Sequence, residues 1–457
     1  MRVEYIGHAK LLFETTAGTL LTDPWFSEPA YANSLWHYPP MERDVEEFLD
    51  VDYLYVSHRH LDHFDPASLL KFPKDTPVII ARFPHNYLER DLKTLGFKHV
   101  IELLDWQKWR LDSHTSITMI NTNHPGAEDC SIIGEEDGAT VFNQNDNMMS
   151  TEKLAEIGNR FDIDIAFYMY AATGAYPGRF ELPAEVIREE GAKKRLRFME
   201  KAVEALKVLK PKQAVPFASD FGWFADDHLE LNEINRTYPN DMAEMVGREI
   251  PEIKSFYMNP LDVWTPEQGL TRNNDMAWEP EAVRHHIRKL ADERQPRIRE
   301  LMAAEERDTS DLSERFKDFF NNAVSITWDE AKEIGKFNVL MHAEGTTETS
   351  WTIDFSKESD WVSVGEPETW DMRVIAPDNL LMAFVEGELE FQAIWNARLK
   401  ISRPGGYSSP EQRFWKWLFT AVDSIASGRE ASPCICALGD YVMSGNTDSK
   451  SVTASSP

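Results

Sequence analysis

The stretch that decides the fold of this chain is Asp52-Tyr53-Leu54-Tyr55-Val56-Ser57-His58-Arg59-His60-Leu61-Asp62-His63-Phe64-Asp65. Its apolar residues 53–56 predict a short buried strand. Four polar residues then follow within six positions, namely His58, His60, Asp62 and His63. Packed in an apolar core, these side chains would leave polar atoms unsatisfied, which is costly. Because imidazole and carboxylate groups bind zinc, iron and manganese, the stretch predicts a metal site at the end of a strand.

The spacing of these four residues indicates two metal ions. His58 and His60 lie two positions apart, so on an extended segment both can point toward one ion. Asp62 and His63 lie just past the turn and can reach a second ion about 3.5–4 Å away, the usual separation in two-metal sites. A polar loop that happens to be rich in histidine is the alternative interpretation. We predict a site for two divalent metal ions.

The pattern His-x-His-x-Asp-His at the end of a strand resembles the signature of the metallo-β-lactamase fold superfamily. This resemblance implies an α/β fold, an αββα sandwich. It implies that His124, at a later strand end, completes the first metal site, with Glu128 and Asp129 as second choices. It also implies that Asp146 bridges both ions, although an aspartate there can simply close an Asx turn. The reaction stays open, because the superfamily includes hydrolases, oxygenases and electron-transfer proteins.

Segments along residues 1–270 resemble one branch of this superfamily in particular. Taken in order, they resemble the catalytic portion of the CMP-N-acetylneuraminate hydroxylase family; they are Gly7-His8-Ala9, Asp23-Pro24-Trp25, Asn143-Gln144-Asn145-Asp146, Ala171-Ala172-Thr173-Gly174, Val215-Pro216-Phe217-Ala218-Ser219-Asp220 and Val263-Trp264-Thr265-Pro266. Hydrolytic members of the superfamily supply a last histidine near residues 215–219, and this sequence has none there. Asp220 can substitute, or the second site stays open. An open, oxygen-rich site favours iron and O2 chemistry over a closed zinc pair.

The cysteines indicate whether the sequence contains an iron–sulfur module. The sialic-acid hydroxylases carry a Rieske iron–sulfur module, which needs Cys-x-His and Cys-x-x-His pairs. None of the three cysteines, Cys130, Cys434 and Cys436, belongs to such a pair. The sequence therefore predicts that reducing electrons come from an external donor. Three cysteines also make no disulfide framework, which indicates a reducing cytoplasm.

Composition excludes several classes of partner. The chain has 457 residues and a formal net charge of −29, which opposes binding to nucleic acid or to anionic lipid. A hydrophobic fraction of 42% is typical of a globular protein. The N-terminus has no signal-peptide pattern, and no apolar run approaches about 18 residues. We expect a soluble cytoplasmic protein without membrane insertion.

Length predicts more than one domain. We expect a catalytic domain over residues 1–270, a charged helical connector over 271–335, an α+β accessory domain over 336–443 and a disordered tail over 444–457. The order of strands and helices in the accessory domain resembles sterol-carrier-like domains. A small domain that serves dimerisation or acts as a lid is the alternative. The sequence does not predict the oligomeric state.

The same candidate ligands are compatible with two different functions. In the first, a di-iron oxygenase uses O2 to oxidise a small organic molecule. His58, His60 and His124 hold one iron, Asp62, His63 and Asp146 hold the other, and Asp220 is a further candidate. In the second, zinc or manganese activates water to hydrolyse a phosphodiester, lactone or amide. Asp62 and Asp146 are the candidate catalytic residues, and a non-catalytic metal-binding protein is a third possibility.

Overall fold

A computed structural model describes residues 1–84, 87–123, 128–171 and 174–428. These residues form two compact units. Unit 1 comprises residues 1–172 and 195–298, and unit 2 comprises residues 173–194 and 299–457. This division does not test the predicted boundaries at residues 270, 335 and 443, which stay predictions. No helix in the described ranges is long and apolar enough to cross a membrane.

The first sheet of unit 1 has eight strands in the order β17-β16-β1-β2-β3-β5-β6-β7, counted over the described residues. The strands are β1 (Arg2–Gly7), β2 (Lys10–Thr15), β3 (Gly18–Thr22), β5 (Tyr53–Tyr55), β6 (Val78–Ala81), β7 (Val100–Leu103), β16 (Val263–Thr265) and β17 (Gly269–Thr271). The pairs β3·β5, β5·β6 and β6·β7 are parallel, whereas β1, β2 and β3 form an antiparallel meander. Strands β1, β3 and β5 therefore run in one direction and end at the same edge.

The second sheet has seven strands in the order β15-β13-β12-β11-β10-β9-β8 within the described chain. They are β8 (Lys108–Arg110), β9 (Thr115–Asn121), β10 (Cys130–Glu136), β11 (Ala139–Asn143), β12 (Ile165–Met169), β13 (Gln213–Phe217) and β15 (Lys254–Ser255). Strands β11, β12 and β13 are parallel, and β9 runs the same way because β10 is antiparallel to both of its neighbours. Their carboxyl ends also share one edge.

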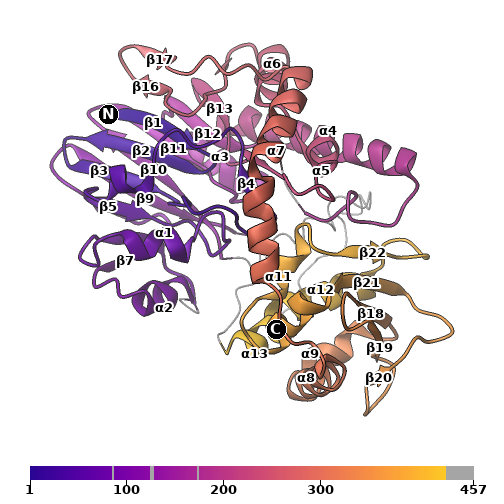
Figure 1. Ribbon diagram of the computed structural model, residues 1–457. Helices are drawn as coiled ribbons and strands as arrows, with labels where there is room; N and C mark the ends of the chain where they lie inside the picture. Colours follow the sequence, from indigo (N-terminus) through magenta and orange to yellow (C-terminus); the bar gives the residue numbers. More distant parts are fainter. Residues whose placement is uncertain (85–86, 124–127, 172–173, 429–457) are drawn as a thin grey trace. The chain divides into compact units, whose positions relative to one another are not determined.

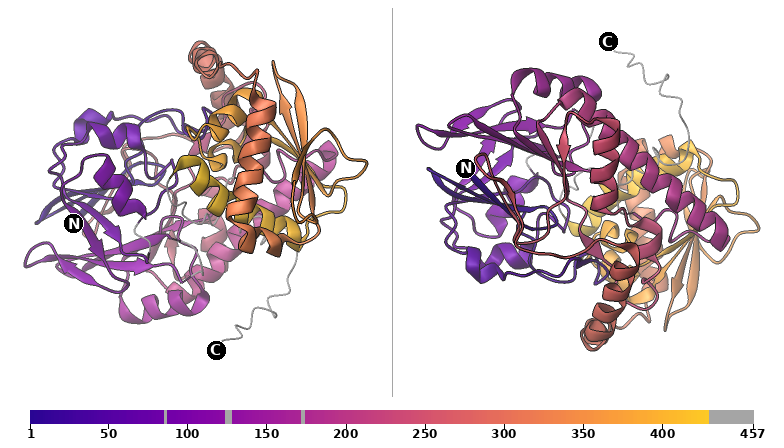
Figure 2. Two further views of the ribbon diagram at one scale, coloured as in Figure 1. Left: turned by 90° about the horizontal axis from the view of Figure 1, so that it is seen from below. Right: turned by 90° about the horizontal axis from the view of Figure 1, so that it is seen from above.

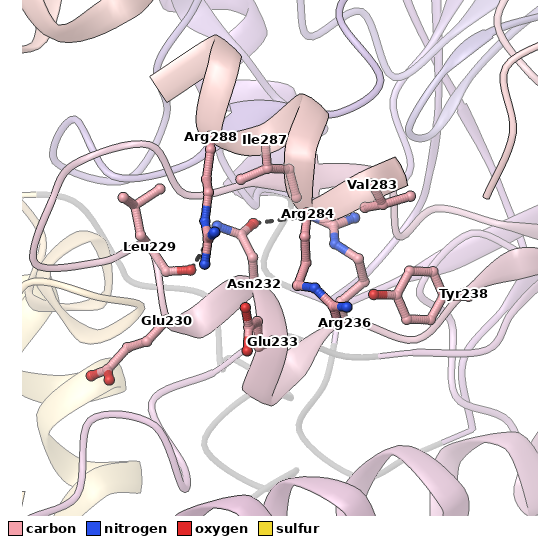
Figure 3. A pocket seen from close by; sticks show the side chains of 10 residues that line it. All are labelled: Leu229, Glu230, Asn232, Glu233, Arg236, Tyr238, Val283, Arg284, Ile287 and Arg288. Carbon is pink, nitrogen blue, oxygen red and sulfur yellow. Dashed lines mark hydrogen bonds between the residues drawn. The ribbon is translucent and has the colours of Figure 1, made fainter. Parts of the chain in front are cut away.

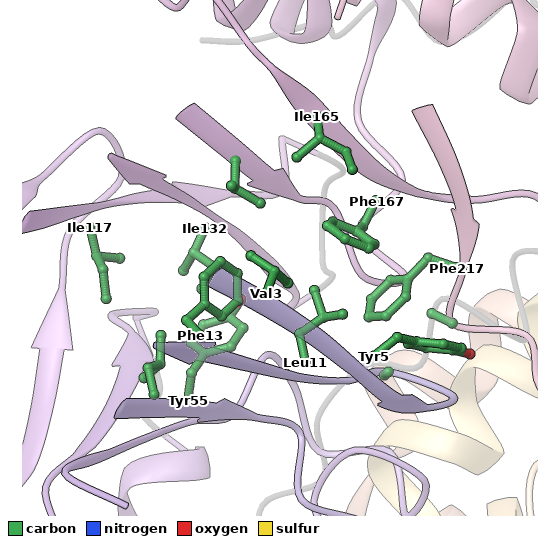
Figure 4. Close-up of a cluster of buried hydrophobic side chains, with 14 of the residues drawn as sticks. Val3, Tyr5, Leu11, Phe13, Tyr55, Ile117, Ile132, Ile165, Phe167 and Phe217 are labelled. Carbon is green, nitrogen blue, oxygen red and sulfur yellow. The ribbon is translucent and has the colours of Figure 1, made fainter. Parts of the chain in front are cut away.

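A buried apolar layer joins the two sheets (Figure 4). It takes Leu11 and Phe13 from the first sheet and Ile132, Phe167 and Phe217 from the second. Side chains alternate between the faces of a strand, so the residues between them point to the outer faces. Those outer faces are covered by α1 (Pro66–Lys71) and α2 (Tyr87–Thr94) on the first sheet, and by α3 (Thr151–Arg160), α4 (Ala184–Leu209) and α6 (Pro239–Glu249) on the second. The left view of Figure 2 shows helices on both sides of the strands. The predicted αββα sandwich is confirmed.

Shorter elements complete unit 1 near the shared edge. They are β4 (Trp36–His37), which pairs with β14 (Phe221–Gly222), the 3-10 turn η1 (Val45–Phe48), α5 (Leu231–Asn235), and the start of α7 (Pro280–Ala304). The β4·β14 ribbon ties the long aromatic loop after β3 to the segment that follows β13. That loop is thereby held close to the strand ends.

Unit 2 is an α+β structure around a five-stranded sheet, counted over the residues that are described (Figure 1). The strands, in the order β20-β19-β18-β21-β22, are β18 (Asn338–Glu344), β19 (Thr349–Asp354), β20 (Val362–Val364), β21 (Met372–Pro377) and β22 (Lys400–Ser402). The helices are α8 (Leu312–Ile326), α9 (Trp328–Ala331), η2 (Lys332–Ile334), α10 (Asp378–Val385), α11 (Phe391–Trp395), α12 (Ser409–Trp417), η3 (Leu418–Val422) and α13 (Asp423–Ser427). Aromatic rings fill its core, as where Phe316 stacks on Trp351 with centroids 4.0 Å apart.

Candidate metal centre

The candidate centre lies where strands of both sheets end. His8 follows β1, Asp23 follows β3, and the histidine-rich stretch follows β5. Asp146 follows β11 of the second sheet. Residues far apart in sequence meet here because the strands that precede them run in the same direction and end at one edge.

A tight turn arranges the predicted cluster. The backbone N–H groups of His63 and Phe64 both donate to the carbonyl of His60, at 2.9 and 2.7 Å. Asp65 then caps α1 by accepting a hydrogen bond from the backbone N–H of Ala67 at 3.2 Å. This use of Asp65 as a helix cap ends the run of candidate ligands at His63.

The three histidines of the stretch lie together. The His58 ring centroid is 4.3 Å from that of His60 and 4.2 Å from that of His63. Nε2 of His58 is 2.7 Å from Nδ1 of His60. His58 and His63 are buried and His60 is half-buried. These two ring nitrogens are close together, but the two groups of candidate ligand atoms among the described residues include His58 and His63 and not His60, whose role as a ligand stays a prediction.

Asp23 orients His63 from behind. Its carboxylate lies 3.1 Å from Nδ1 of His63 and accepts hydrogen bonds from the backbone N–H and the hydroxyl of Ser57. Asp23 is fully buried and has a positive φ of 40°. A carboxylate on one ring nitrogen fixes the tautomer, so that the other nitrogen, Nε2, is free for a metal.

Asp62 is held at both oxygens. Nε2 of His8 lies 3.2 Å from Oδ2, and the hydroxyl of Tyr31 donates to Oδ1 at 2.7 Å. His8, Asp62 and His63 each bring a ligand atom to within 4.8 Å of the others. All three are buried. They form one group that can hold an ion.

A second group includes the other sheet. His58, His63 and Asp146 each offer a ligand atom within the same 4.8 Å limit, and Oδ2 of Asp146 is 3.6 Å from Nε2 of His63. His63 belongs to both groups. Asp129, the second choice near the predicted third histidine, is buried with Oδ1 3.5 Å from Nδ1 of His58. It therefore contacts the far side of that ring.

With no metal ion bound, the electrostatics favour the ligand forms of His58 and Asp62 and the protonated form of His63. Burial, together with the neighbouring His63 and His60, lowers the pKa of His58 well below its usual value, so its ring is neutral. Although burial opposes ionisation, His63 and His8 hold the pKa of Asp62 well below its usual value. Burial also opposes a charge on His63, but Asp146 and Asp23 raise its pKa well above the usual value. A bound cation would replace that proton on His63.

Unsatisfied atoms test whether a metal fits. Nε2 of His63, Nδ1 of His8 and Oδ1 of Asp146 are buried without a hydrogen-bond partner. Such atoms are costly unless something binds them, and all three are metal-ligand atoms. The donor set is imidazole and carboxylate, which suits borderline divalent ions. These residues fit a metal centre.

Two predicted ligands need separate mention. His124 lies outside the described residues, so its role stays a prediction. Asp220 lies outside both groups, because Tyr5 donates a short hydrogen bond to its carboxylate. Burial raises the pKa of Asp220 to about 7, even though Tyr5, Arg236 and Lys10 lower it. The clusters give no support to Asp220 as a ligand.

Sequence reasoning left His8 without a firm role and gave none to Asp23 and Tyr31 at the centre. The signal for Asp23 was available, because an Asp-Pro pair ends a strand that lies beside the strand before His58. The positive φ of His8, 54°, is visible only in the structure. Tyr31 belongs to the long aromatic loop after β3, which the pairing of β4 with β14 holds close to the strand ends.

Comparison with known proteins supports this class of fold. Residues 19–217 match the family model described as the beta-lactamase superfamily domain. Together with the sandwich and the histidine–aspartate cluster, the match shows a metallo-β-lactamase-like fold, which implies binding of divalent metal. Curated relatives that match the chain in sequence include proteins named as hydroxylases.

The individual relatives differ in chemistry. A Mycolicibacterium smegmatis protein named as a Rieske 2Fe-2S iron-sulfur protein is 32% identical over 242 residues, covering 51% of this chain and 46% of its own length. Cytidine monophosphate-N-acetylneuraminic acid hydroxylase of Danio rerio is 26% identical over 282 residues, covering 58% and 44%. An isothiocyanate hydrolase from Delia radicum gut bacteria has a TM-score of 0.43 at 16% identity, covering 58% of this chain and 98% of that one. The chain spans about half the length of the curated relatives it matches.

Proposed function

We propose that the protein is a di-iron oxygenase that oxidises a small organic molecule with O2 and external electrons. His58, His60 and His124 hold one ion, and Asp62, His63 and the bridging Asp146 hold the other. Two iron ions held in this way would supply reductive activation of O2. The matched relatives with hydroxylase activity in their names support the reaction class.

The observation that carries this proposal is the ligand set at the carboxyl end of β13. The sequence there reads Phe217-Ala218-Ser219-Asp220 and offers no histidine, and Asp220 is engaged by Tyr5. The second ion therefore depends on the carboxylates of Asp62 and Asp146 and on the imidazoles of His63 and His8. Oxygen-rich sites with open positions suit iron that must bind O2.

The side chains around the ligands set their geometry. Asp23 presents Nε2 of His63 to the site, and Tyr31 with His8 fixes the plane of the Asp62 carboxylate. The rings of Trp25 and Phe221 flank His8, with centroids 5.2 and 6.1 Å from its own. These rings exclude water from that side of the centre, which strengthens the interactions among its charged groups.

The overall reaction needs a reductant. One oxygen atom of O2 enters a C–H bond of the substrate, and the other leaves as water, so two electrons and two protons are consumed for each turnover. We propose an external electron donor of the iron–sulfur or flavin class, because none of Cys130, Cys434 and Cys436 lies in a Cys-x-His or Cys-x-x-His pair. We place the protein in the cytoplasm, where such reductases and free thiols occur together.

Oxygen uptake tests the proposal. Protein loaded with iron, reduced without air and freed of reductant, is mixed with oxygenated buffer in an oxygen electrode. We expect uptake in proportion to the protein, and we expect Asp146→Asn to lose it because a neutral amide bridges two cations poorly. Asp137→Asn, an exposed aspartate in a β-turn, is the matched control and should consume as much O2 as the parent.

Zinc or manganese hydrolysis is the second function, because neutral imidazole and carboxylate ligands such as His58 and Asp62 also suit zinc. It predicts cleavage of bis-p-nitrophenyl phosphate by the zinc-loaded protein, at equal rates with and without O2. That result, together with no O2 uptake by the reduced iron form, would rule out the oxygenase.

We also propose that residues 336–443 form a sterol-carrier-like domain that holds an apolar part of the substrate. The aromatic interior of unit 2 supports a role with apolar ligands. The full chain should then bind a fluorescent fatty acid saturably. If no binding occurs and light scattering instead shows a dimer, the alternative of a dimerisation domain holds.

A further inference from the structure

A pocket of about 250 Å³ lies in unit 1 between α5 and α7 (Figure 3). It is lined by Leu229, Glu230, Asn232, Glu233, Arg236, Tyr238, Val283, Arg284, Ile287 and Arg288. None of these residues belongs to the two metal-binding groups. The lining combines three arginines with the apolar side chains of α7, so it offers both charge and an apolar wall.

Two of the arginines have no carboxylate partner. Arg284 and Arg288 are exposed, lie one helical turn apart on α7 and form no hydrogen bond or ion pair with any described residue. The chain as a whole has 77 acidic against 48 basic residues, so most cations here have acidic groups to pair with. Two unpaired guanidinium groups on one wall of a pocket are therefore a local excess of positive charge.

The third arginine of the pocket, Arg236, is a buried side chain. Arg236 is buried, with 5% of its surface exposed, and its Nη2 donates to the backbone carbonyl of Phe221 at 2.5 Å and to the side chain of Asn232 at 3.0 Å. Its Nε is buried without a hydrogen-bond partner. A buried guanidinium N–H that lacks an acceptor is costly, and an oxyanion would satisfy it.

The acidic residues do not cancel this charge. Glu230 and Glu233 are exposed, and neither carboxylate forms an ion pair with the three arginines. Figure 3 shows Glu230 at the side opposite Arg236 and Tyr238. In the same view Arg236 and Arg284 lie toward the phenol of Tyr238 and Arg288 lies across the cavity beside Leu229, so arginine side chains line it from two sides.

We propose that this pocket binds a small organic oxyanion, a carboxylate or phosphate ester with a short apolar part. The guanidinium groups of Arg236, Arg284 and Arg288 bind the anionic head, which guanidinium forks match geometrically. Val283, Ile287 and Leu229 contact the apolar part. The volume admits one small molecule and not a polymer.

Calorimetric titration of the full chain tests the site. The probes are phenyl phosphate and benzoate, with benzyl alcohol as a neutral compound of similar shape. We expect saturable binding of one or both anions, weakened by salt, and none of the alcohol. Preference for one anion identifies which head group the site takes.

Substitutions locate the binding. Arg284→Gln and Arg288→Gln should each weaken binding about tenfold or more, since each removes a charged hydrogen bond. Arg236→Gln should do the same, although its contact with Phe221 makes a fold check by circular dichroism necessary. Lys289→Gln is the control, because Lys289 is an exposed cation on the same helix outside the pocket, paired with Glu293 at 3.7 Å.

The proposal fails if the parent protein binds neither anion saturably. It also fails if the two exposed arginine variants bind as tightly as the Lys289→Gln control, or if benzyl alcohol binds as well as benzoate. These outcomes do not depend on metal content, so they can be distinguished from failure of the oxygenase proposal.

Discussion

At the scale of single residues, His58, Asp62 and His63 are each contacted by a partner that lies outside the histidine-rich stretch. Asp23 holds His63, Tyr31 and His8 hold Asp62, and Asp129 lies behind His58. Ligand atoms that are fixed before the metal arrives lose little freedom on binding it. Substitution of these partners should therefore change metal binding, as substitution of the ligands does.

Asp23→Asn should weaken metal binding about 10- to 100-fold, because an amide cannot orient and polarise His63 as a carboxylate does. Competition with a metal chelator measures the change. Asp137→Asn breaks a similar but exposed aspartate contact, with His114 at 2.8 Å, and should leave affinity as it was. Equal affinities for both variants would mean that Asp23 only supports the fold.

His60→Ala should lose metal and activity together, since His60 supplies one of the nitrogens that meet at 2.7 Å. Elemental analysis after dialysis gives the metal content. His114→Ala, which removes an exposed imidazole elsewhere, should keep its full content. Full metal occupancy in His60→Ala would show that the ligand assignment is wrong.

The site residues that could be predicted from the sequence lie close together along the chain, whereas those that could not be predicted lie far from them in sequence. His58 to His63 are readable because four ligand types fall within six positions after an apolar strand. His8, Asp23 and Tyr31 reach the same place only through strand direction and loop path, which single-sequence patterns do not fix. Asp220 stays a prediction, because its residue type fits a ligand but its partner in the structure is the hydroxyl of Tyr5.

At the scale of elements, the loop between β3 and η1 is anchored by one buried histidine. His37 in β4 has Nδ1 3.0 Å from Glu28, and Nε2 3.0 Å from both Nζ of Lys10 and the carbonyl of Trp25. The ring of Trp25 stacks on it with centroids 3.7 Å apart. This loop carries Tyr31, so the anchor bears on the geometry at Asp62.

Acid should destabilise the protein through His37. Burial, with Lys10 beside it, lowers the pKa of His37 from 6.5 to about 4. Between these values the unfolded chain binds a proton that the folded chain does not, so stability falls as pH drops from 6.5 to 4. The loss is about 3 kcal/mol for such a shift.

Urea unfolding at pH 7 and pH 4.5 measures this loss in the parent and in His37→Gln. The midpoint of the parent should fall more steeply on acidification, because glutamine does not titrate. His114→Gln is the control, because Asp137 raises the pKa of this exposed histidine, and removing it should not lessen the loss of stability on acidification. Identical pH dependence in parent and His37→Gln would contradict the assignment.

Most elements of unit 1 were predictable because their periodicity is strong. The short apolar run at residues 78–81 forms β6, and the amphipathic stretch after Pro183 forms α4 at Ala184–Leu209. In unit 2, the amphipathic stretch that begins at Ser409 contains a π-helical turn, Leu418–Val422. Apolar spacing alone does not distinguish that turn from regular helix, because it depends on how the aromatic rings pack.

At the scale of the whole molecule, metal binding should be linked to the stability of unit 1. The centre joins strand ends from both sheets, and an ion that binds only the folded state stabilises it. Removal of metal by a chelator should lower the thermal midpoint by several degrees, and adding metal back should restore it. Asp146→Asn should show a smaller difference, and an unchanged midpoint in the parent would mean that no ion binds at the centre.

The central claim is that the centre holds two iron ions, and one measurement tests it most directly. The protein as purified is analysed for metal, and its optical spectrum is recorded before and after reduction without air. We predict two irons per chain and an oxo-bridge charge-transfer band that disappears on reduction. Two tightly held zinc ions, with no absorption in the visible range, would contradict the claim.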